Sequence, residues 1–266
     1  MVPSRCLSAF LVLGTLACQA HAQPEATIPP QRAPDTLEAR TLACVGCHGD
    51  KGRGVANVYF PRLAGKPSGY LYNQLIAFQE GRRRYAPMNY LLAYLPPAYL
   101  KQMADYFAAQ SPDPIPVTAP GAPPATIAHG QQIVSKGLPG KKIPACTTCH
   151  GATLTGREPG IPGLLGLRAD YVSAQLGAWR YGTRTALAPD CMQVIASTLS
   201  EPEVAAVSAY LATLPVPAND RPAPMDNTHL PMGCGSQSPH PSISAAAVAA
   251  TGSASTSAPA PAGAKP

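Results

Sequence analysis

The motif Cys-x-x-Cys-His occurs twice in this chain and constrains its fold more than any other feature. The first copy consists of Cys44, Cys47 and His48, and the second of Cys146, Cys149 and His150. This spacing is typical of c-type haem attachment, in which each thiol adds to a haem vinyl group and the histidine binds the iron. The sequence therefore predicts two covalently bound haem c groups, each with its own folded unit.

Two other interpretations of the motif need features that the sequence does not offer. A Cys-x-x-Cys pair also occurs in disulfide redox motifs, which accompany a βαβ pattern, and in zinc sites, which use matched Cys and His pairs. Neither pattern accompanies these cysteines. The haem interpretation is therefore preferred.

The N-terminus predicts export. Arg5 precedes an apolar run at 7–16, and a small-x-small cleavage site follows at 20–22, so residues 1–22 are predicted to be a signal peptide. The apolar run is too short to span a bilayer comfortably. A lipoprotein acylated at Cys18 is the alternative, although leucine is missing three residues before that cysteine. Covalent haem attachment outside the bacterial cytoplasm agrees with a periplasmic location.

Length allows one or two domains, and the repeated motif and the proline content favour two domains joined by extended segments. The chain has 266 residues, 32 of them proline, and its charged fraction is only 13%. The predicted order after the signal peptide is a leader (23–35), a first domain (36–110), a Pro-rich linker (111–124), a second domain (125–214) and a Pro/Ala/Ser-rich tail (215–266). Residues 243–266 have too little apolar bulk to offset the entropy of ordering, so the C-terminal tail is expected to be disordered, with surface tethering or partner binding as the alternative.

Helical periodicity dominates both predicted domains, which gives an all-α expectation. Helices are predicted at 36–47, at 69–81 and from Pro97 to Gln110, where apolar residues recur at i, i+3, i+4 and i+7. In the second domain Ser200 and Glu203 have the spacing of a capping box at the start of the last helix.

The second domain repeats the first at an offset of 101 residues. The pairs at this offset are Pro61 with Pro162, Tyr70 with Tyr171, Gln74 with Gln175, Phe78 with Trp179, and Arg83 with Arg184. Matched spacing over this length indicates duplication of one haem-binding unit.

Met88 and Met192 are the predicted sixth ligands of the two irons. Each is placed in an irregular stretch between two predicted helices, seven residues before a leucine that precedes the last helix of its unit. Thioether opposite histidine raises the reduction potential and leaves no iron position for a substrate. The alternative is that these methionines fill the core, as Met103 is expected to do. Met225 and Met232 lie outside both repeats and are weaker candidates.

These motifs together resemble the dihaem cytochrome c4 family of class I c-type cytochromes. The resemblance covers residues 36–214 and rests on two haem motifs, each followed by a Pro-x-Leu loop, a Tyr-x-x-x-Gln-Leu helix and a methionine. It implies an all-α protein with two tandem cytochrome c domains, each wrapped around one haem. It also implies an exported electron carrier whose haems lie close together and pass electrons towards terminal oxidases.

The resemblance also suggests supporting residues near each haem. The carbonyls of Pro61 and Pro162 are expected to accept a hydrogen bond from the iron-binding histidines. Five further residues are expected either near haem propionates or in ordinary roles, as packed core or solvated charge: Trp179, Tyr70, Tyr171, Arg83 and Arg184.

Cys191 and Cys234 remain once the haems are attached and the signal peptide is removed. Two spare cysteines in an oxidising compartment favour a disulfide. We therefore predict a Cys191–Cys234 bond that holds the start of the tail beside the second haem, with two free thiols as the alternative.

The predicted function is one-electron transfer between periplasmic redox proteins. Basic residues outnumber acidic ones by ten to seven in 23–115 and by seven to five in 116–214. Such a charge favours weak docking to an acidic partner, and its scattered distribution argues against nucleic acid. Expected partners are a terminal oxidase, a quinol-oxidising complex or a dehydrogenase, with membrane association only through a partner. The alternatives are a dihaem subunit of a dehydrogenase and a dihaem peroxidase, which needs an iron open to peroxide.

Overall fold

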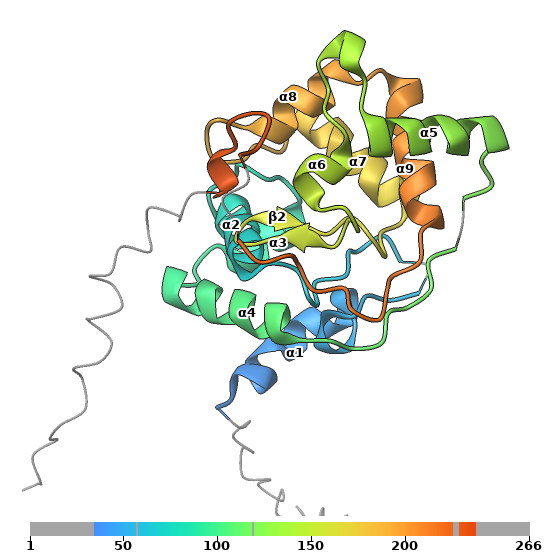
Figure 1. Ribbon diagram of the computed structural model, residues 1–266. Coiled ribbons are helices and arrows are strands. Elements are labelled where there is room, and N and C mark those ends of the chain that lie inside the picture. The colour runs from blue at the N-terminus through green and yellow to red at the C-terminus, as the bar shows by residue number, and fades with distance from the viewer. Residues whose placement is uncertain (1–34, 57, 119, 226–228, 238–266) are drawn as a thin grey trace, which may run out of the picture. The chain divides into compact units, whose positions relative to one another are not determined.

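The computed structural model describes residues 35–56, 58–118, 120–225 and 229–237 (Figure 1). The predicted signal peptide, the alternative lipid site at Cys18, the leader up to residue 34 and the low-complexity end of the tail lie outside these ranges. Within the described residues, no helix combines the length and the apolar character needed to cross a membrane.

Helices make up most of the described structure. The first repeat contains α1 (Leu37–His48), α2 (Ser68–Gln79), α3 (Ala86–Leu92) and α4 (Pro97–Ala109). The second contains α5 (Pro124–Lys136), α6 (Cys146–His150), α7 (Ala169–Arg180), α8 (Cys191–Thr198) and α9 (Glu201–Thr213). Short 3-10 turns are η1 (Asp50–Gly52), η2 (Pro139–Lys141) and η3 (Gly235–Gln237). Strands β1 (Gly156–Arg157) and β2 (Ile161–Pro162) pair antiparallel, with Gly156 opposite Pro162.

Each repeat has a hydrophobic core of its own. In the first, buried side chains of α2 and α4 pack together around Leu71 and Leu100. In the second, α5, α7 and α9 meet around Ile133 and Leu211. Burying such a leucine or isoleucine contributes about 1.5–3 kcal/mol. The duplicated sequence therefore folds into two centres of packing rather than one.

Gly130 allows α5 and α9 to cross at close range. A Cβ atom at this position would lie 2.0 Å from the carbonyl oxygen of Ala206, well inside van der Waals contact. Glycine is therefore required there by the approach of the two backbones.

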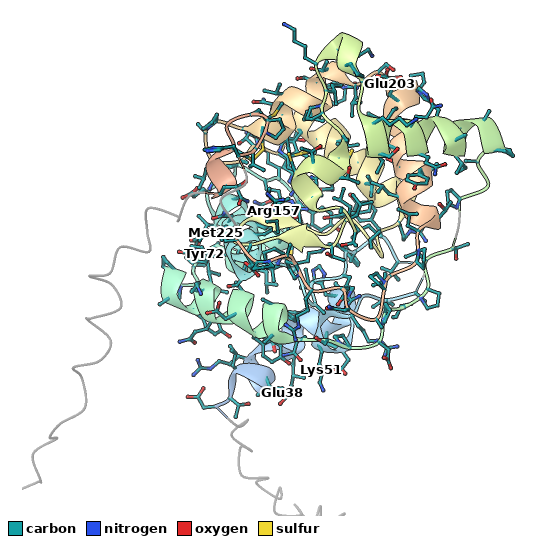
Figure 2. All side chains as sticks on the ribbon, viewed as in Figure 1. Glu38, Lys51, Tyr72, Arg157, Glu203 and Met225 are labelled. Atoms are coloured by element: carbon teal, nitrogen blue, oxygen red, sulfur yellow. A yellow bond between two sulfur atoms is a disulfide. The ribbon has the colours of Figure 1, made fainter. Side chains whose placement is uncertain are left out.

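The helix predictions from periodicity are confirmed to within one or two residues for α1, α2 and α4. The predicted capping box is also confirmed. Ser200 Oγ accepts from the Glu203 N–H at 3.4 Å, and Glu203 Oε2 accepts from the Ser200 N–H at 2.7 Å. Figure 2 labels Glu203 at this helix start, where it also pairs with Lys141 at 2.7 Å.

The expectation of irregular structure around the two methionines is wrong. Met88 lies in α3 and Met192 in α8. Pro87 stands in the first turn of α3, where the missing N–H costs nothing because that turn has no intrahelical acceptor. Asp190 caps α8, since its Oδ1 accepts the Gln193 N–H at 3.0 Å.

The chain after α9 folds back against both repeats. Asp220 forms an ion pair with the buried Arg62 at 2.8 Å. The Ala223 carbonyl accepts a hydrogen bond from the Glu158 N–H at 2.9 Å, and the Ala223 N–H donates to the Gly156 carbonyl at 2.9 Å. The predicted tail therefore begins with a segment that packs on the folded body, drawn in orange and red in Figure 1.

Candidate haem sites and the contact between them

Both motif histidines end a helix and are held by the same kind of hydrogen bond. His48 is the last residue of α1 and His150 the last of α6. Their Nδ1 atoms lie 2.8 Å from the carbonyl oxygens of Pro61 and Pro162 respectively. A carbonyl only accepts, so Nδ1 carries the proton and Nε2 is left as the nitrogen able to bind iron.

Burial keeps these imidazoles in the form that binds metals. His48 and His150 are 8% and 7% exposed. Burial lowers the pKa of both histidines, and the proline carbonyls oppose that shift without reversing it. The neutral ring is the ligand form.

A glycine after each histidine turns the chain sharply. Gly49 has φ +74° and Gly151 has φ +85°, a region that favours glycine. A Cβ on Gly49 would lie 2.0 Å from the carbonyl oxygen of Gly54. This turn returns the chain towards Pro61, so the same local geometry that ends the helix supplies the acceptor for His48.

Among the described residues, none of the four motif cysteines forms a disulfide. Burial raises the pKa of Cys146 to about 11 and raises that of Cys44 as well, so these sulfurs are protonated in the haem-free chain. Within each motif the cysteines stand three residues apart on a helix and therefore share a face. Unpaired thiols on one face are what two thioether bonds to a single haem require.

The structure brings the ligand candidates of the second site into one cavity. Its lining includes Cys149, His150 and Met192. At the first site, Cys44 and Met88 both pack against the core of the first repeat, and the His48 ring lies 6.2 Å from that of Phe60.

Arg83 and Arg184 join the two repeats in a reciprocal arrangement. Arg83 donates to Tyr171 Oη at 2.9 Å and to Gln175 Oε1 at 2.8 Å. Arg184 donates to Tyr70 Oη at 3.2 Å and to Gln74 Oε1 at 2.8 Å. Each arginine also bonds the glutamine of its own repeat, Arg83 at 3.1 Å and Arg184 at 2.8 Å.

The idea that these arginines are solvated charges is wrong, because Arg83 is 8% and Arg184 4% exposed. Each guanidinium stacks on a ring of its own repeat, Arg83 over Phe78 at 4.6 Å and Arg184 over Trp179 at 3.7 Å. Backbone bonds between residues 82–84 and 183–185 fix the junction further. Packing and the partner repeat, rather than solvent, hold both charges.

This buried positive charge suits the propionates of a bound haem. In the described part of the chain neither Arg83 nor Arg184 pairs with a carboxylate. Burial raises the pKa of Tyr70, but the Arg184 and Arg83 guanidiniums outweigh it and bring the pKa to about 8. Trp179 Nε1 is buried with no hydrogen-bond partner among the described residues. These groups lack the anionic acceptors that two haems would supply.

Sequence reasoning used Gln74 and Gln175 only to align the repeats and missed their role as shared acceptors. Their equal spacing from Arg83 and Arg184 was the available signal. Tyr59, whose Oη accepts from Gln175 Nε2 at 3.3 Å, has no counterpart in the second repeat, so the duplication gave no clue to it.

No family model matches the chain. A thiosulfate dehydrogenase electron acceptor of Thiomonas intermedia is 34% identical over 215 residues, covering 81% of this chain and 94% of that protein. Cytochrome c4 of Pseudomonas aeruginosa is 36% identical over 179 residues, covering 66% of this chain and 86% of that protein. The chain belongs to the dihaem cytochrome c4 family. The resemblance inferred from the motifs is thereby confirmed.

Solved structures confirm the fold of this cytochrome c4. Reduced cytochrome c4 from Pseudomonas stutzeri has a TM-score of 0.58 at 30% identity, over 67% of this chain and 96% of that one. A thiosulfate dehydrogenase from Marichromatium purpuratum has a TM-score of 0.59 at 33% identity, but this chain covers only 36% of it. The expected all-α fold with two class I cytochrome domains is confirmed.

Family membership also establishes the general chemistry. The protein is an electron carrier with two covalently bound haem c groups, and its partners are redox proteins. It transfers electrons and is not an enzyme, which removes the peroxidase alternative. Membership further supports a periplasmic location.

Proposed function

We propose that this cytochrome c4 accepts single electrons from a periplasmic dehydrogenase and passes them to a further redox partner such as a terminal oxidase. The observation that carries the proposal is the pair of matched histidine sites joined by the reciprocal arginine contact. Two matched sites packed together suit a relay better than a single substrate pocket does.

The residues that would hold the two haems follow from the motifs and the site geometry. Thioether attachment would use Cys44 and Cys47 in the first domain and Cys146 and Cys149 in the second. The axial ligands would be His48 with Met88 and His150 with Met192. When bound, each haem supplies an iron that alternates between Fe(III) and Fe(II), which is the whole of the redox chemistry.

The protein's own groups orient the ligands and balance charge. The Pro61 and Pro162 carbonyls fix each imidazole and make it a better donor through the Nδ1 hydrogen bond. Met88 and Met192, if bound to iron through their thioethers, would raise the reduction potential and leave no iron position for a substrate. Arg83 and Arg184 would neutralise propionates at the contact between the domains, with Tyr70, Tyr171 and Trp179 as further donors.

The names of two relatives favour a dehydrogenase as electron donor. Proteins of Thiomonas intermedia and Stutzerimonas stutzeri, 34% and 37% identical to this chain, are described as thiosulfate dehydrogenase electron acceptors. We therefore place a dehydrogenase of that kind ahead of a quinol-oxidising complex as the source of electrons. The modest positive charge of both domains suits a weak, salt-sensitive encounter with an acidic surface.

A stable subunit role is the second candidate. It is favoured by the similarity to 36% of a thiosulfate dehydrogenase chain, so that a region resembling this protein is part of a longer polypeptide there. Copurification at native salt separates the candidates. A free carrier elutes alone, whereas a subunit elutes at fixed stoichiometry with its dehydrogenase.

The absorption spectrum of the purified holoprotein tests the ligand assignment. The oxidised protein is expected to show the far-red thioether-to-iron charge-transfer band. Met88→Ala and Met192→Ala are each expected to remove about half of it, and the double variant all of it. A high-spin spectrum in the unaltered protein would contradict the assignment.

Stopped-flow mixing tests the proposed donor. Thiosulfate dehydrogenase supplied with thiosulfate is expected to reduce both haems, with a rate that falls as salt is added. Mass spectrometry of the mature protein, expected to start near Gln23, tests the predicted signal peptide against acylation at Cys18. The domain boundaries at 36–110 and 125–214 stay predictions for limited proteolysis.

A further inference from the structure

The C-terminal segment at 229–237 forms part of the wall of the second haem cavity. Leu230, Met232 and Cys234 line this cavity together with His150 and Met192. Leu230 and Met232 are half-buried, and they come from a segment that the cytochrome repeat itself does not contain. A segment outside the second repeat therefore helps to close the second site. The first repeat contains no equivalent of this segment.

Three contacts hold this segment to the loop that precedes Met192. Cys234 is joined to Cys191 by a disulfide, with the two Cα atoms 4.9 Å apart. The Gly235 N–H donates to the Pro189 carbonyl at 2.9 Å. A Cβ on Gly235 would lie 2.4 Å from the carbonyl oxygens of both Leu187 and Ala188, so the two backbones are in close contact.

A further close approach holds the segment on its other side. A Cβ on Gly160 would lie 1.9 Å from the carbonyl oxygen of Ser236. Gly160 directly precedes β2, which carries the carbonyl acceptor of His150. The segment thus spans from the methionine side of the cavity to the histidine side.

The start of α8, which carries Met192, is fixed from two directions. From inside the repeat, Asp190 accepts the N–H groups of Gln193 at 3.0 Å and Ala186 at 2.6 Å. From outside, the disulfide acts at Cys191, the residue immediately before Met192. Movement of the start of α8 away from the site must therefore displace the bonded segment as well.

The first site differs in this respect. In the part of the chain that the structure describes, the Cys191–Cys234 bond is the only disulfide, so α3 has no covalent tie, although Gln79 Nε2 donates to the Leu92 carbonyl at its end at 2.9 Å. Asn89 fixes the start of that helix through Tyr85, Phe78 and Arg83 backbone groups. The outer side of α3 is open, with Tyr90 85% exposed.

We propose that residues 229–237, held by the Cys191–Cys234 disulfide, position Met192 and shut the second haem site against small exogenous ligands. The two sites then differ in accessibility although the repeats that form them are alike. The first site admits ligands when α3 moves, and the second admits them only when the bonded segment also moves. This inference rests on Met192 as an axial ligand, as in the proposed function.

Imidazole binding to the oxidised holoprotein tests the inference, with the far-red band as readout. In a Met88→Ala background the remaining band belongs to the Met192 site, and in a Met192→Ala background it belongs to the Met88 site. Imidazole is expected to abolish the band at the Met88 site at a concentration at least about tenfold lower than at the Met192 site. A segment that leaves the Met192 site accessible for about a tenth of the time weakens the apparent affinity of that site for imidazole about tenfold.

Variants of the segment supply the decisive comparison in the Met88→Ala background. Cys191→Ser with Cys234→Ser is expected to bring imidazole affinity at the Met192 site to within about threefold of that at the Met88 site. Leu230→Ala with Met232→Ala, which keeps the disulfide, is expected to act in the same direction. Met225→Ala is the matched control, because Met225 lies earlier in the same C-terminal extension, outside the cavity lining, and is 73% exposed (Figure 2).

The outcomes separate this inference from the proposed function. Absence of the far-red band before imidazole is added would overturn the ligand assignment, and the inference with it. A normal band with imidazole affinity unchanged in both segment variants would overturn the inference alone. Equal imidazole affinity at the Met88 and Met192 sites, measured with residues 229–237 unaltered, would also overturn the inference. Retained band intensity shows that the variants are folded, and a shift of the Met192-site reduction potential in the cysteine variant gives an independent readout.

Discussion

The side chains that matter most at these sites are each oriented by one backbone carbonyl or by a few specific side chains. One proline carbonyl decides which nitrogen of His48 carries a proton, and another does so for His150. Arg184 receives its orientation from Trp179 below it and from two acceptors of the first repeat. Individual substitutions at such positions therefore change electronic properties as well as stability.

Arg184→Gln is expected to lower the reduction potential of the haems, because removing a nearby buried cation makes the oxidised iron less unfavourable. It should also destabilise the holoprotein by about 1.5–3 kcal/mol, the range for hydrogen bonds to charged groups. Potentiometric titration and denaturant unfolding measure the two effects.

Arg184→Lys separates charge from geometry, since lysine keeps the charge but loses the planar fork. Arg184→Lys should leave the reduction potential close to that of the unaltered protein and should lower the free energy of unfolding. Arg84→Gln, at an exposed neighbour of the same junction, is the control and should change neither. A potential in Arg184→Gln equal to that of the unaltered protein would contradict the placement of propionates beside this residue.

At the scale of elements, the crossing of α5 and α9 should tolerate no side chain at Gly130. Gly130→Val is expected to cost at least about 1–3 kcal/mol, because the helices must separate to admit the new atoms. Gly177→Ala in α7 is the control. A Cβ there meets nothing within 4 Å, so alanine should be neutral or stabilise the helix by about 0.5–1 kcal/mol. Thermal unfolding of the Gly130→Val and Gly177→Ala holoproteins measures both effects. An equal loss of stability in the two variants would contradict the close crossing of α5 and α9.

The start of α9 should depend on its capping box. Ser200→Ala removes the acceptor for the Glu203 N–H and is expected to cost about 0.5–2 kcal/mol. Glu203→Gln keeps a side-chain acceptor for the Ser200 N–H and should cost less. Denaturant unfolding compares the two variants, and a larger loss in Glu203→Gln would count against the box as the main contribution.

Periodicity predicted those elements whose apolar stripe is long, and it failed for those that depend on local chemistry. α2 and α4 were predicted because their buried residues recur with helical spacing. α3 was missed because the stretch around Met88 was expected to be irregular, whereas Pro87 stands in the first turn of a helix, where proline is tolerated. The helix α5 was missed despite a similar signal, a proline at its first residue and Ile133 and Val134 on its buried side.

The candidate sites were predictable where one motif holds all the parts, as with the haem cysteines and histidines. The contact between the domains was not, because its hydrogen bonds join residues about 90 or 110 positions apart. Spacing within a repeat aligned Arg83 with Arg184 but could not show that each bonds the glutamine of the other repeat. Tertiary placement alone decides whether a charged residue is solvated or buried.

At the scale of the whole molecule, the segment after α9 should act as part of the folded body. Asp220→Asn removes the charge that pairs with Arg62, a residue 6% exposed, and is expected to cost about 1–3 kcal/mol. It should also speed proteolysis after residue 214, because the segment loses its ion pair with the first repeat. Asp113→Asn, at an exposed linker residue, is the control. Unchanged cleavage in Asp220→Asn would contradict a packed segment.

The reciprocal arginine contact has a consequence for how such a molecule arises. Each half donates to the other the same groups that it receives, so either half alone presents a surface that matches a copy of itself. A single-haem ancestor with this surface would have formed a symmetric homodimer. Fusion of the two genes would then have changed little in the contact. It would have replaced a concentration-dependent encounter with a permanent one and freed each half to diverge.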